Sequence, residues 1–214
     1  MGLYQDLLRD ERLYEVLFQY DHDLARAARR GGCGWCGGRV DQANYSRKPR
    51  GLPERLAVRY DLRLSLCCAV EGCRRRLTPP SVRFLGRRVY SAAVVIVAAM
   101  RGRGRAQQQL RQWLGVSART LARWRRWWRT TFARSRFWSV ARGRFTGRLR
   151  AMDLPRVLLG RFPGDDRSRL IALLRFLSPI TTASAPECAR SVRRRVTPRA
   201  ARRRRAVRAE GDRD

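Results

Sequence analysis

Residues 33–38 read Cys-Gly-Trp-Cys-Gly-Gly, and residues 67–73 read Cys-Cys-Ala-Val-Glu-Gly-Cys. These stretches hold five of the six cysteines and lie in a segment, 31–88, of glycines, prolines and short alternating strands. Two cysteines three residues apart and followed by glycine form a zinc knuckle, because the tight turn directs backbone amides toward the thiolate sulfurs. Two such pairs held by short strands give the tetrahedral four-cysteine geometry of structural zinc. We therefore expect a zinc-ribbon-like module at 31–88.

The ligand set combines Cys33 and Cys36 with Cys73 and one of two adjacent cysteines. Cys68 is favoured because it shares one strand face with three leucines, Leu62, Leu64 and Leu66. Cys67 then points outward and remains the alternate ligand. Four thiolates leave no open coordination position, so the zinc is expected to be structural.

Other interpretations of the cysteines are weaker. A redox Cys-x-x-Cys motif sits at the start of a helix in a βαβ unit, whereas Gly37-Gly38 leads into strand-like sequence. Chance burial of small residues does not explain five cysteines within 41 residues. His22, inside a helical stretch, is expected to be exposed or partly buried rather than a ligand.

A second pattern lies at residues 105–128. Apolar side chains recur there at the spacing of the buried positions of a helix-turn-helix: Leu110, Leu114, Val116, Leu121 and Trp124. Gly115 stands where the turn needs a positive φ, which glycine tolerates best, and the Ser117 hydroxyl can cap the next helix. Arg111 departs from the pattern, because close helix packing usually requires alanine there. We expect helices at 105–114 and 117–132.

The second of these helices has a basic face. Its inner stripe is Leu121, Trp124 and Trp128, and arginines follow another face at i, i+4 and i+7. Such a face suits the major groove of DNA. An ordinary solvated basic face is the alternative, but the absence of acidic residues between 101 and 150 favours DNA. The candidate DNA-binding residues are Ser117, Arg119, Arg123, Arg125, Arg126 and Arg129.

The charge balance points to a polyanionic partner. The chain of 214 residues has 49 Lys+Arg against 17 Asp+Glu, a formal net charge of +32. Neutralising phosphates with release of counterions would drive binding to nucleic acid. A GC-rich genome would explain arginine over lysine, but it does not explain the missing acids. Two arginine runs in the tail are candidate phosphate contacts: Arg193, Arg194, Arg195, Arg202, Arg203, Arg204 and Arg205.

These patterns predict a mostly α protein (α+β) with a small embedded β zinc ribbon, a helix-turn-helix and a basic tail that is disordered when free. Asp10 caps a helix from 11 to about 29, and Tyr90–Met100 is a buried helix too short to span a bilayer. No signal peptide is recognised, so we expect a cytoplasmic, nucleoid-associated protein. The expected units are an N-terminal helical segment (1–30), the ribbon (31–88), the helix-turn-helix module (89–150), a short helical extension (151–178) and the tail (179–214).

The cysteine ribbon followed by Leu-Gly-Val-Ser…Thr-Leu…Trp at 114–124 resembles the N-terminal DNA-binding region of bacterial insertion-sequence transposases. Residues 47–51 and 67–84 also resemble a group of uncharacterised bacterial proteins associated with mobile elements. The resemblance covers roughly 30–133 and implies zinc ligands at Cys33, Cys36, Cys68 and Cys73, with a recognition helix at 117–128. It does not extend to the catalytic domain, which needs three carboxylates to hold two metal ions.

We therefore expect a DNA-binding protein that is not an enzyme, related to transposases or accessory to a mobile element, with double-stranded DNA as its partner. A homodimer or a transposition complex is a possible assembly. The first alternative is a basic protein that binds RNA or the ribosome. The second is a catalytic transposase or nuclease, against which the scarcity of acids after residue 133 argues.

Overall fold

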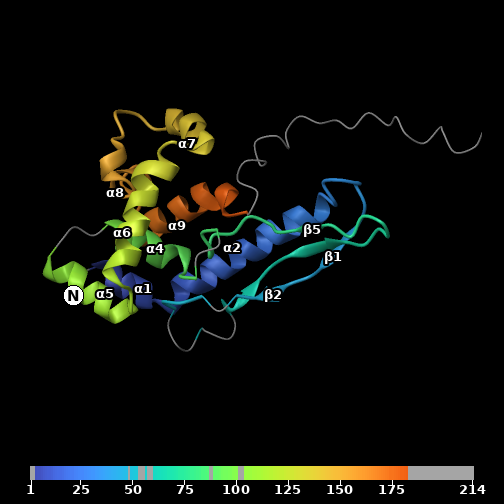
Figure 1. The fold of residues 1–214 in the computed structure, drawn as a ribbon, viewed down its shortest axis with the longest axis horizontal. Coiled ribbons are helices and arrows are strands. Elements are labelled where there is room, and N and C mark those ends of the chain that lie inside the picture. Colours follow the sequence, from blue (N-terminus) through green and yellow to red (C-terminus); the bar gives the residue numbers. More distant parts are fainter. Residues whose placement is uncertain are drawn as a thin grey trace, which may run out of the picture.

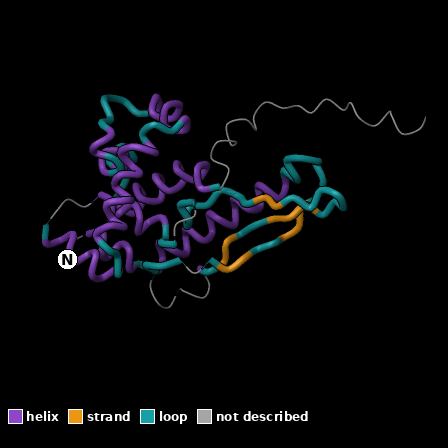
Figure 2. The backbone as a smooth tube through the Cα atoms, viewed as in Figure 1, coloured by secondary structure: helices purple, strands orange, loops and turns teal. Residues whose placement is uncertain are grey.

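The computed structural model describes residues 3–47, 49–52, 56, 60–86, 89–100 and 104–182. It is mostly helical with a small region of sheet (Figures 1 and 2). The tail arginines predicted to contact phosphates, from Arg193 to Arg205, lie outside the described residues.

Two helices open the chain, α1 (Leu3–Arg9) and α2 (Glu11–Arg30). The predicted cap of α2 is confirmed, because the Asp10 carboxylate accepts a hydrogen bond from the backbone N–H of Arg12 at 3.0 Å. One face of α2 is buried through Leu13, Tyr14, Leu17 and Asp21. With 20 residues, α2 is about 30 Å long.

Two small antiparallel sheets follow α2. One has the order β1-β4-β5, formed by Val40–Gln42, Leu66–Cys68 and Arg76–Leu77. The other pairs β2 (Tyr45–Ser46) with β3 (Leu62–Arg63). In the first sheet Val40 stands opposite Cys68 and Leu66 stands opposite Leu77.

The predicted alternation along residues 62–68 is wrong in part. Leu64, Leu66 and Cys68 are buried as expected, but Leu62 is 38% exposed, and Arg63 and Ser65 are buried. The chain changes partners between β3 and β4, so it is not one continuous strand with one inner face. Hydrogen bonds satisfy the buried polar groups, since the Arg63 guanidinium donates to the carbonyl of Pro79 and the Ser65 hydroxyl to that of Leu77.

The helical part is built around α4 (Ala92–Met100), which starts two residues later than predicted. Every residue of α4 from Ala92 to Ala99 is buried, as expected for a helix that is apolar all round. Packed with it are α5 (Arg105–Leu114) and α6 (Ala118–Trp127), and α6 continues into a π-helical turn, η2 (Trp128–Phe132).

Shorter elements complete this part. They are α7 (Arg136–Ala141), η3 (Arg142–Arg144), η4 (Ala151–Asp153), α8 (Arg156–Leu159), α9 (Asp166–Leu177) and η5 (Ser178–Thr181). Helix α9 lies within the helical extension expected at 151–178, and Asp165 caps it by accepting from the Ser168 N–H at 2.8 Å. Buried leucines from α8 and α9 lie in the same core as α4, α5 and α6.

The sheet region and the helical part have separate cores. The helical core extends from Leu8 to Leu177, whereas the ribbon core consists of Cys33, Val40, Leu66 and Cys68. A buried ion pair stands between α2 and the segment after β5, where Asp21 accepts from the Arg83 Nε at 2.8 Å. Arg83 in turn donates to the carbonyl of Leu62 in β3 at 2.8 Å, so this pair ties α2 to the second sheet.

Candidate metal centre and nucleic-acid interface

Four cysteine sulfurs gather at the end of α2. The Sγ atoms of Cys33, Cys36, Cys68 and Cys73 all lie within 4.8 Å of one another. Cys33 and Cys73 are 3.7 Å apart, and Cys36 and Cys68 are 3.5 Å apart, measured between Sγ atoms. A tetrahedral zinc with Zn–S bonds of 2.3 Å requires S–S edges of about 3.8 Å. The four sulfurs therefore fit one metal ion.

Turn geometry brings the two cysteine pairs together. In the first turn the Gly37 N–H donates to the Cys33 carbonyl at 2.8 Å, and Gly37 has φ +71°. In the second turn the Cys73 N–H donates to the Val70 carbonyl at 3.1 Å, and Gly72 has φ +82°. Both glycines occupy the left-handed region, which side chains disfavour. The second turn therefore brings Cys73 close to Cys68, although their spacing in the sequence is wider than that of Cys33 and Cys36.

The surroundings of Cys33 and Cys68 shift the pKa values of their thiols in opposite directions. Hydrogen bonds from the backbone N–H groups of Cys36 and Trp35 lower the pKa of the Cys33 thiol to about 6. Burial raises the pKa of the Cys68 thiol to about 12. A buried thiol of this kind gives up its proton when a cation takes the proton's place, so metal binding is coupled to proton release.

The other sequence candidates near this site lie apart from it. Cys67, the alternate ligand, is half-exposed, and its Sγ donates to the Arg74 carbonyl at 3.4 Å. His22 is partly exposed and its ring packs against Phe18, with ring centroids 4.5 Å apart. Within the described part of the chain, the four cysteines form the one cluster of metal-ligating side chains.

The junction of α5 and α6 has the local structure that the sequence predicts. Gly115 ends α5 in the left-handed region at φ +59°, and Ser117 caps α6 by accepting from the Thr120 N–H at 3.2 Å. Val116 between them is buried. Arg111, the departure from the pattern, is half-buried, and its Nε donates to the Val116 carbonyl at 3.2 Å. Its side chain therefore stabilises the turn that an alanine would leave unsupported.

The two faces of α6 differ sharply. Leu121 and Trp124 are buried, as is Trp128 of the following turn, and Trp124 also packs edge-on against Tyr90 at 5.1 Å between ring centroids. Four of the five predicted arginines are exposed, and Arg125 is half-buried. Ala118 and Ala122 are also exposed and lie on the arginine face, where their small side chains allow close approach to the helix. The exposed arginines are Arg119, Arg123, Arg126 and Arg129.

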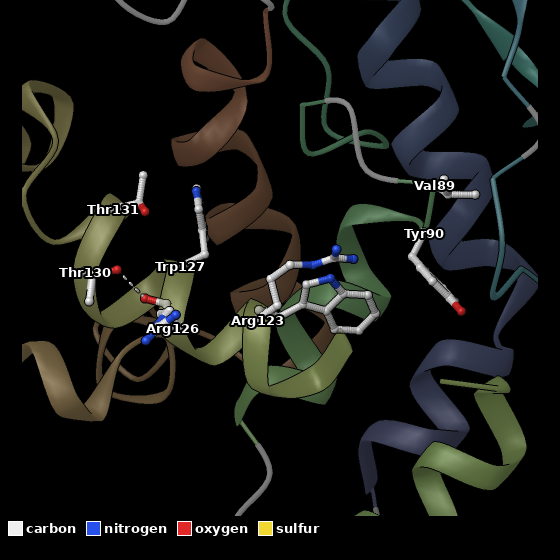
Figure 3. A pocket seen from close by; sticks show the side chains of 8 residues that line it. Val89, Tyr90, Arg123, Arg126, Trp127, Thr130 and Thr131 are labelled. Atoms are coloured by element: carbon white, nitrogen blue, oxygen red, sulfur yellow. Dashed lines mark hydrogen bonds between the residues drawn. The ribbon is translucent and has the colours of Figure 1, made fainter. Parts of the chain in front are cut away.

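A cleft of about 540 Å³ lies along one side of α6. Figure 3 shows Arg123, Arg126 and Trp127 on one wall and Tyr90, from the segment before α4, on the other. The Thr130 hydroxyl, also in this cleft, donates to the Arg126 carbonyl at 2.7 Å. The cleft thus combines aromatic rings with guanidinium groups.

A second cleft, of about 630 Å³, lies on the other side of α6 and is strongly basic. Arg125, Arg126 and Arg129 line it from α6 and η2, and Arg156 lines it from the start of α8. Asp153 is the one acidic residue among the described residues that line this cleft. Sequence analysis missed Arg156, because it is distant from the α6 arginines in the sequence. Tertiary packing of η4 and α8 beside α6 brings it into this cleft.

Comparisons with known proteins add no relative. No family model, curated protein or solved structure matches the chain. None of the helices in the described ranges is long and apolar enough to cross a bilayer.

Proposed function

We propose that this protein is a DNA-binding protein without catalytic activity, in which a structural zinc ion holds the ribbon and α6 reads double-stranded DNA. The observation that carries the proposal is the arginine face of α6, which lies opposite the buried Leu121 and Trp124 and contains no acidic residue. In this proposal α5, the Gly115 turn and α6 act as a helix-turn-helix. The resemblance to insertion-sequence transposases extends the proposal to the DNA of a mobile element.

The fit to duplex DNA follows from dimensions and charge. The major groove is about 12 Å wide and admits one α-helix. Arg119 and Arg123, on the first turns of α6, are placed to reach base edges, since recognition helices contact bases with their N-terminal residues. The basic cleft with Arg129 and Arg156 would receive the phosphate backbone beside the groove.

Zinc fits the second part of the proposal. The donor set is four sulfurs, two of them buried, at distances that suit a tetrahedral ion. Soft thiolate ligands in a tetrahedron select zinc or iron–sulfur chemistry over magnesium or calcium. With all four positions occupied by protein, the ion would hold the two turns together and leave no place for a substrate.

The test of DNA reading is a selection from random duplex DNA with the wild type and with Arg119→Ala/Arg123→Ala. A bidentate arginine–guanine contact discriminates by about 1–3 kcal/mol, or roughly fivefold to 150-fold, so the double variant, which removes two such contacts, should lose sequence preference by roughly thirtyfold or more. The matched control is Arg142→Ala/Arg144→Ala, which removes the same charge from two exposed arginines of η3. It should lower overall affinity slightly and keep the preferred sequence.

Two outcomes would overturn the proposal. One is a wild type that selects no sequence while a structured RNA outcompetes duplex DNA at equal phosphate concentration, which would support the RNA-binding alternative. The other is equal loss of preference in both double variants, which would show that bulk charge rather than the α6 face reads the DNA.

A further inference from the structure

The tip of the ribbon has an exposed tryptophan that is neither a candidate metal ligand nor part of a hydrophobic core. Trp35 stands between the ligands Cys33 and Cys36, and 54% of its surface is exposed. The guanidinium of Arg75, from the opposite turn, lies over its ring at 4.8 Å from the centroid. Because both residues flank cysteines of the site, the metal would fix the indole in place. Trp35 is therefore a preorganised aromatic platform rather than part of the hydrophobic interior.

The surface around Trp35 is basic and partly apolar. Val70, 42% exposed, packs so closely on Gly38 that a Cβ at this glycine would lie 2.3 Å from the valine methyl, so the two turns form one surface. Exposed arginines lie in three segments of the ribbon end, and Glu71 lies on the same turn as Val70. Arg39 pairs with Asp41 at 3.3 Å, and Arg76 lies over the Tyr45 ring of the second sheet. The exposed arginines are Arg29 and Arg30 at the end of α2, Arg39 beside the first turn, and Arg74, Arg75 and Arg76 on the second.

We propose that this surface, which we call the ribbon tip, binds unpaired bases of DNA by stacking one base on Trp35 while the arginines contact the adjoining phosphates. An indole face stacks on a base face, and in a duplex the base faces are covered by their neighbours. Single-stranded nucleic acid is bound by this combination of a basic surface and an aromatic ring. A protein partner fits less well, because the exposed apolar side chains here are few and the exposed arginines outnumber the acids.

The ribbon tip and α6 lie at opposite ends of the molecule. Figure 1 shows the strands of the ribbon alongside the second half of α2, and the helical core with α6 around the other end of that helix. Helix α2, which is about 30 Å long, runs between these two parts. The choice of DNA rests on the function proposed for α6, because one chain holding both sites would recognise a duplex that continues into an unpaired strand.

The experiment compares three ligands that share one duplex of the preferred sequence. The first is the duplex alone, the second adds a single-stranded oligothymidine extension longer than 30 Å, and the third replaces the extension's bases with abasic sites. Stacking of one base should raise the affinity of the wild type by about tenfold for the oligothymidine ligand over the abasic ligand. Trp35→Ala should abolish this ratio, and Trp35→Phe should retain part of it.

A matched control exists in the helical part of the molecule. Trp113 in α5 is 38% exposed and lies under the Arg9 guanidinium, at 5.0 Å from the ring centroid. Trp113→Ala removes an equivalent tryptophan–arginine pair and should leave the ratio unchanged. Zinc content of Trp35→Ala, measured alongside, shows whether the ribbon is intact, and the Trp35-dependent fluorescence quenching by oligothymidine alone gives an independent measure of stacking.

The failures of the two proposals are distinguishable. If the wild type binds the duplex but gains equally from abasic and oligothymidine extensions, the ribbon tip contacts phosphates only and the stacking proposal is wrong. A larger gain from an oligouridine extension than from oligothymidine would overturn the choice of DNA. If no duplex is bound while oligothymidine quenches Trp35, the function proposed for α6 fails and the ribbon tip proposal stands.

Discussion

The two ends of this molecule are held together by different means. The helical end buries a continuous core that includes the whole of α4 and side chains from α1 through α9. The hydrophobic cluster around the four cysteines has only four buried residues, and two of these are cysteines of the candidate metal site. Apolar burial stabilises by roughly 25 cal/mol per Å², so a core of four small side chains cannot offset the entropy of ordering the strands and turns around it. The comparison predicts that a metal held by the four cysteines would stabilise the turns and strands around them, and that the helical end would fold without it.

The largest expected effect is therefore loss of the metal. Structural zinc contributes on the order of 10 kcal/mol to folding in small zinc modules. Removing zinc with a chelator should unfold the ribbon and leave the helical content of α4 to α9 in place. Hydrogen exchange resolved along the sequence measures this difference, with protection lost at 33–77 and kept at 92–177. Loss of protection throughout the described chain would show that the two ends fold as one unit.

Two adjacent cysteines provide a matched pair for the same test. Cys68→Ser removes a buried ligand and should abolish stoichiometric zinc, whereas Cys67→Ser alters a half-exposed side chain outside the cluster and should keep it. Elemental analysis of both variants decides the matter. Because the ligands must be thiolates, the zinc affinity of the wild type should also fall as the pH is lowered. The reverse result for the two serine variants would make Cys67 the ligand.

The next largest effect is expected where the two ends meet. Asp21 accepts hydrogen bonds from the Ser81 hydroxyl at 2.6 Å, the Val82 N–H at 2.7 Å and the Arg83 Nε. Asp21→Asn leaves the buried Arg83 charge without its carboxylate, which costs about 3–5 kcal/mol. Urea unfolding followed by circular dichroism measures the loss.

Asp23→Asn is the control for this variant, because it removes the same charge two residues further along α2, from an exposed pair with Arg26. Exposed ion pairs contribute little, so its unfolding midpoint should stay near that of the wild type. Equal midpoints for the two variants would mean that the buried pair does not join α2 to the ribbon.

A third prediction concerns the helical end alone. Leu121 of α6 is buried in the helical core, and Leu121→Ala should lower the free energy of unfolding by about 2–5 kcal/mol through the cavity it opens. Zinc content should be unchanged, because this core shares no residue with the ribbon core. Val140→Ala, on the exposed surface of α7, is the control and should be neutral. A loss of zinc in Leu121→Ala would show coupling between the ends.

Sequence analysis succeeded at the helical end where periodicity and caps coincide. The bounds of α5, the Asp10 and Ser117 caps and the inner stripe of α6 all follow from spacing and capping chemistry. The mostly helical fold with a small sheet is confirmed, and so is the clustering of the four cysteines.

Sequence analysis was less successful where the chain changes partners. Cys68 was chosen over Cys67 from strand parity, yet parity fails at Leu62, Arg63 and Ser65, because β3 and β4 belong to different sheets. Parity held only over the short run that ends at Cys68. Likewise Arg156 and the pairing of Trp35 with Arg75 depend on tertiary contacts. No local pattern in the sequence predicts such contacts.

The smallest expected effect separates two roles of Ser117, which caps α6 and is also a candidate DNA contact. Ser117→Ala should cost about 0.5–2 kcal/mol of stability, because the Thr120 N–H loses its acceptor. Ser117→Asp should restore the cap, since aspartate is as good an N-cap as serine, and its charge suits the N-terminus of a helix. The same carboxylate would face DNA phosphates and should weaken duplex binding.

Thermal unfolding and duplex affinity are therefore measured on both variants. From Ser117→Ala to Ser117→Asp, the melting temperature should rise while the affinity for duplex DNA falls. If Ser117→Asp binds duplex DNA as tightly as the wild type, the start of α6 does not approach the DNA, and the comparison then leaves the ribbon tip as the stronger candidate for nucleic-acid binding.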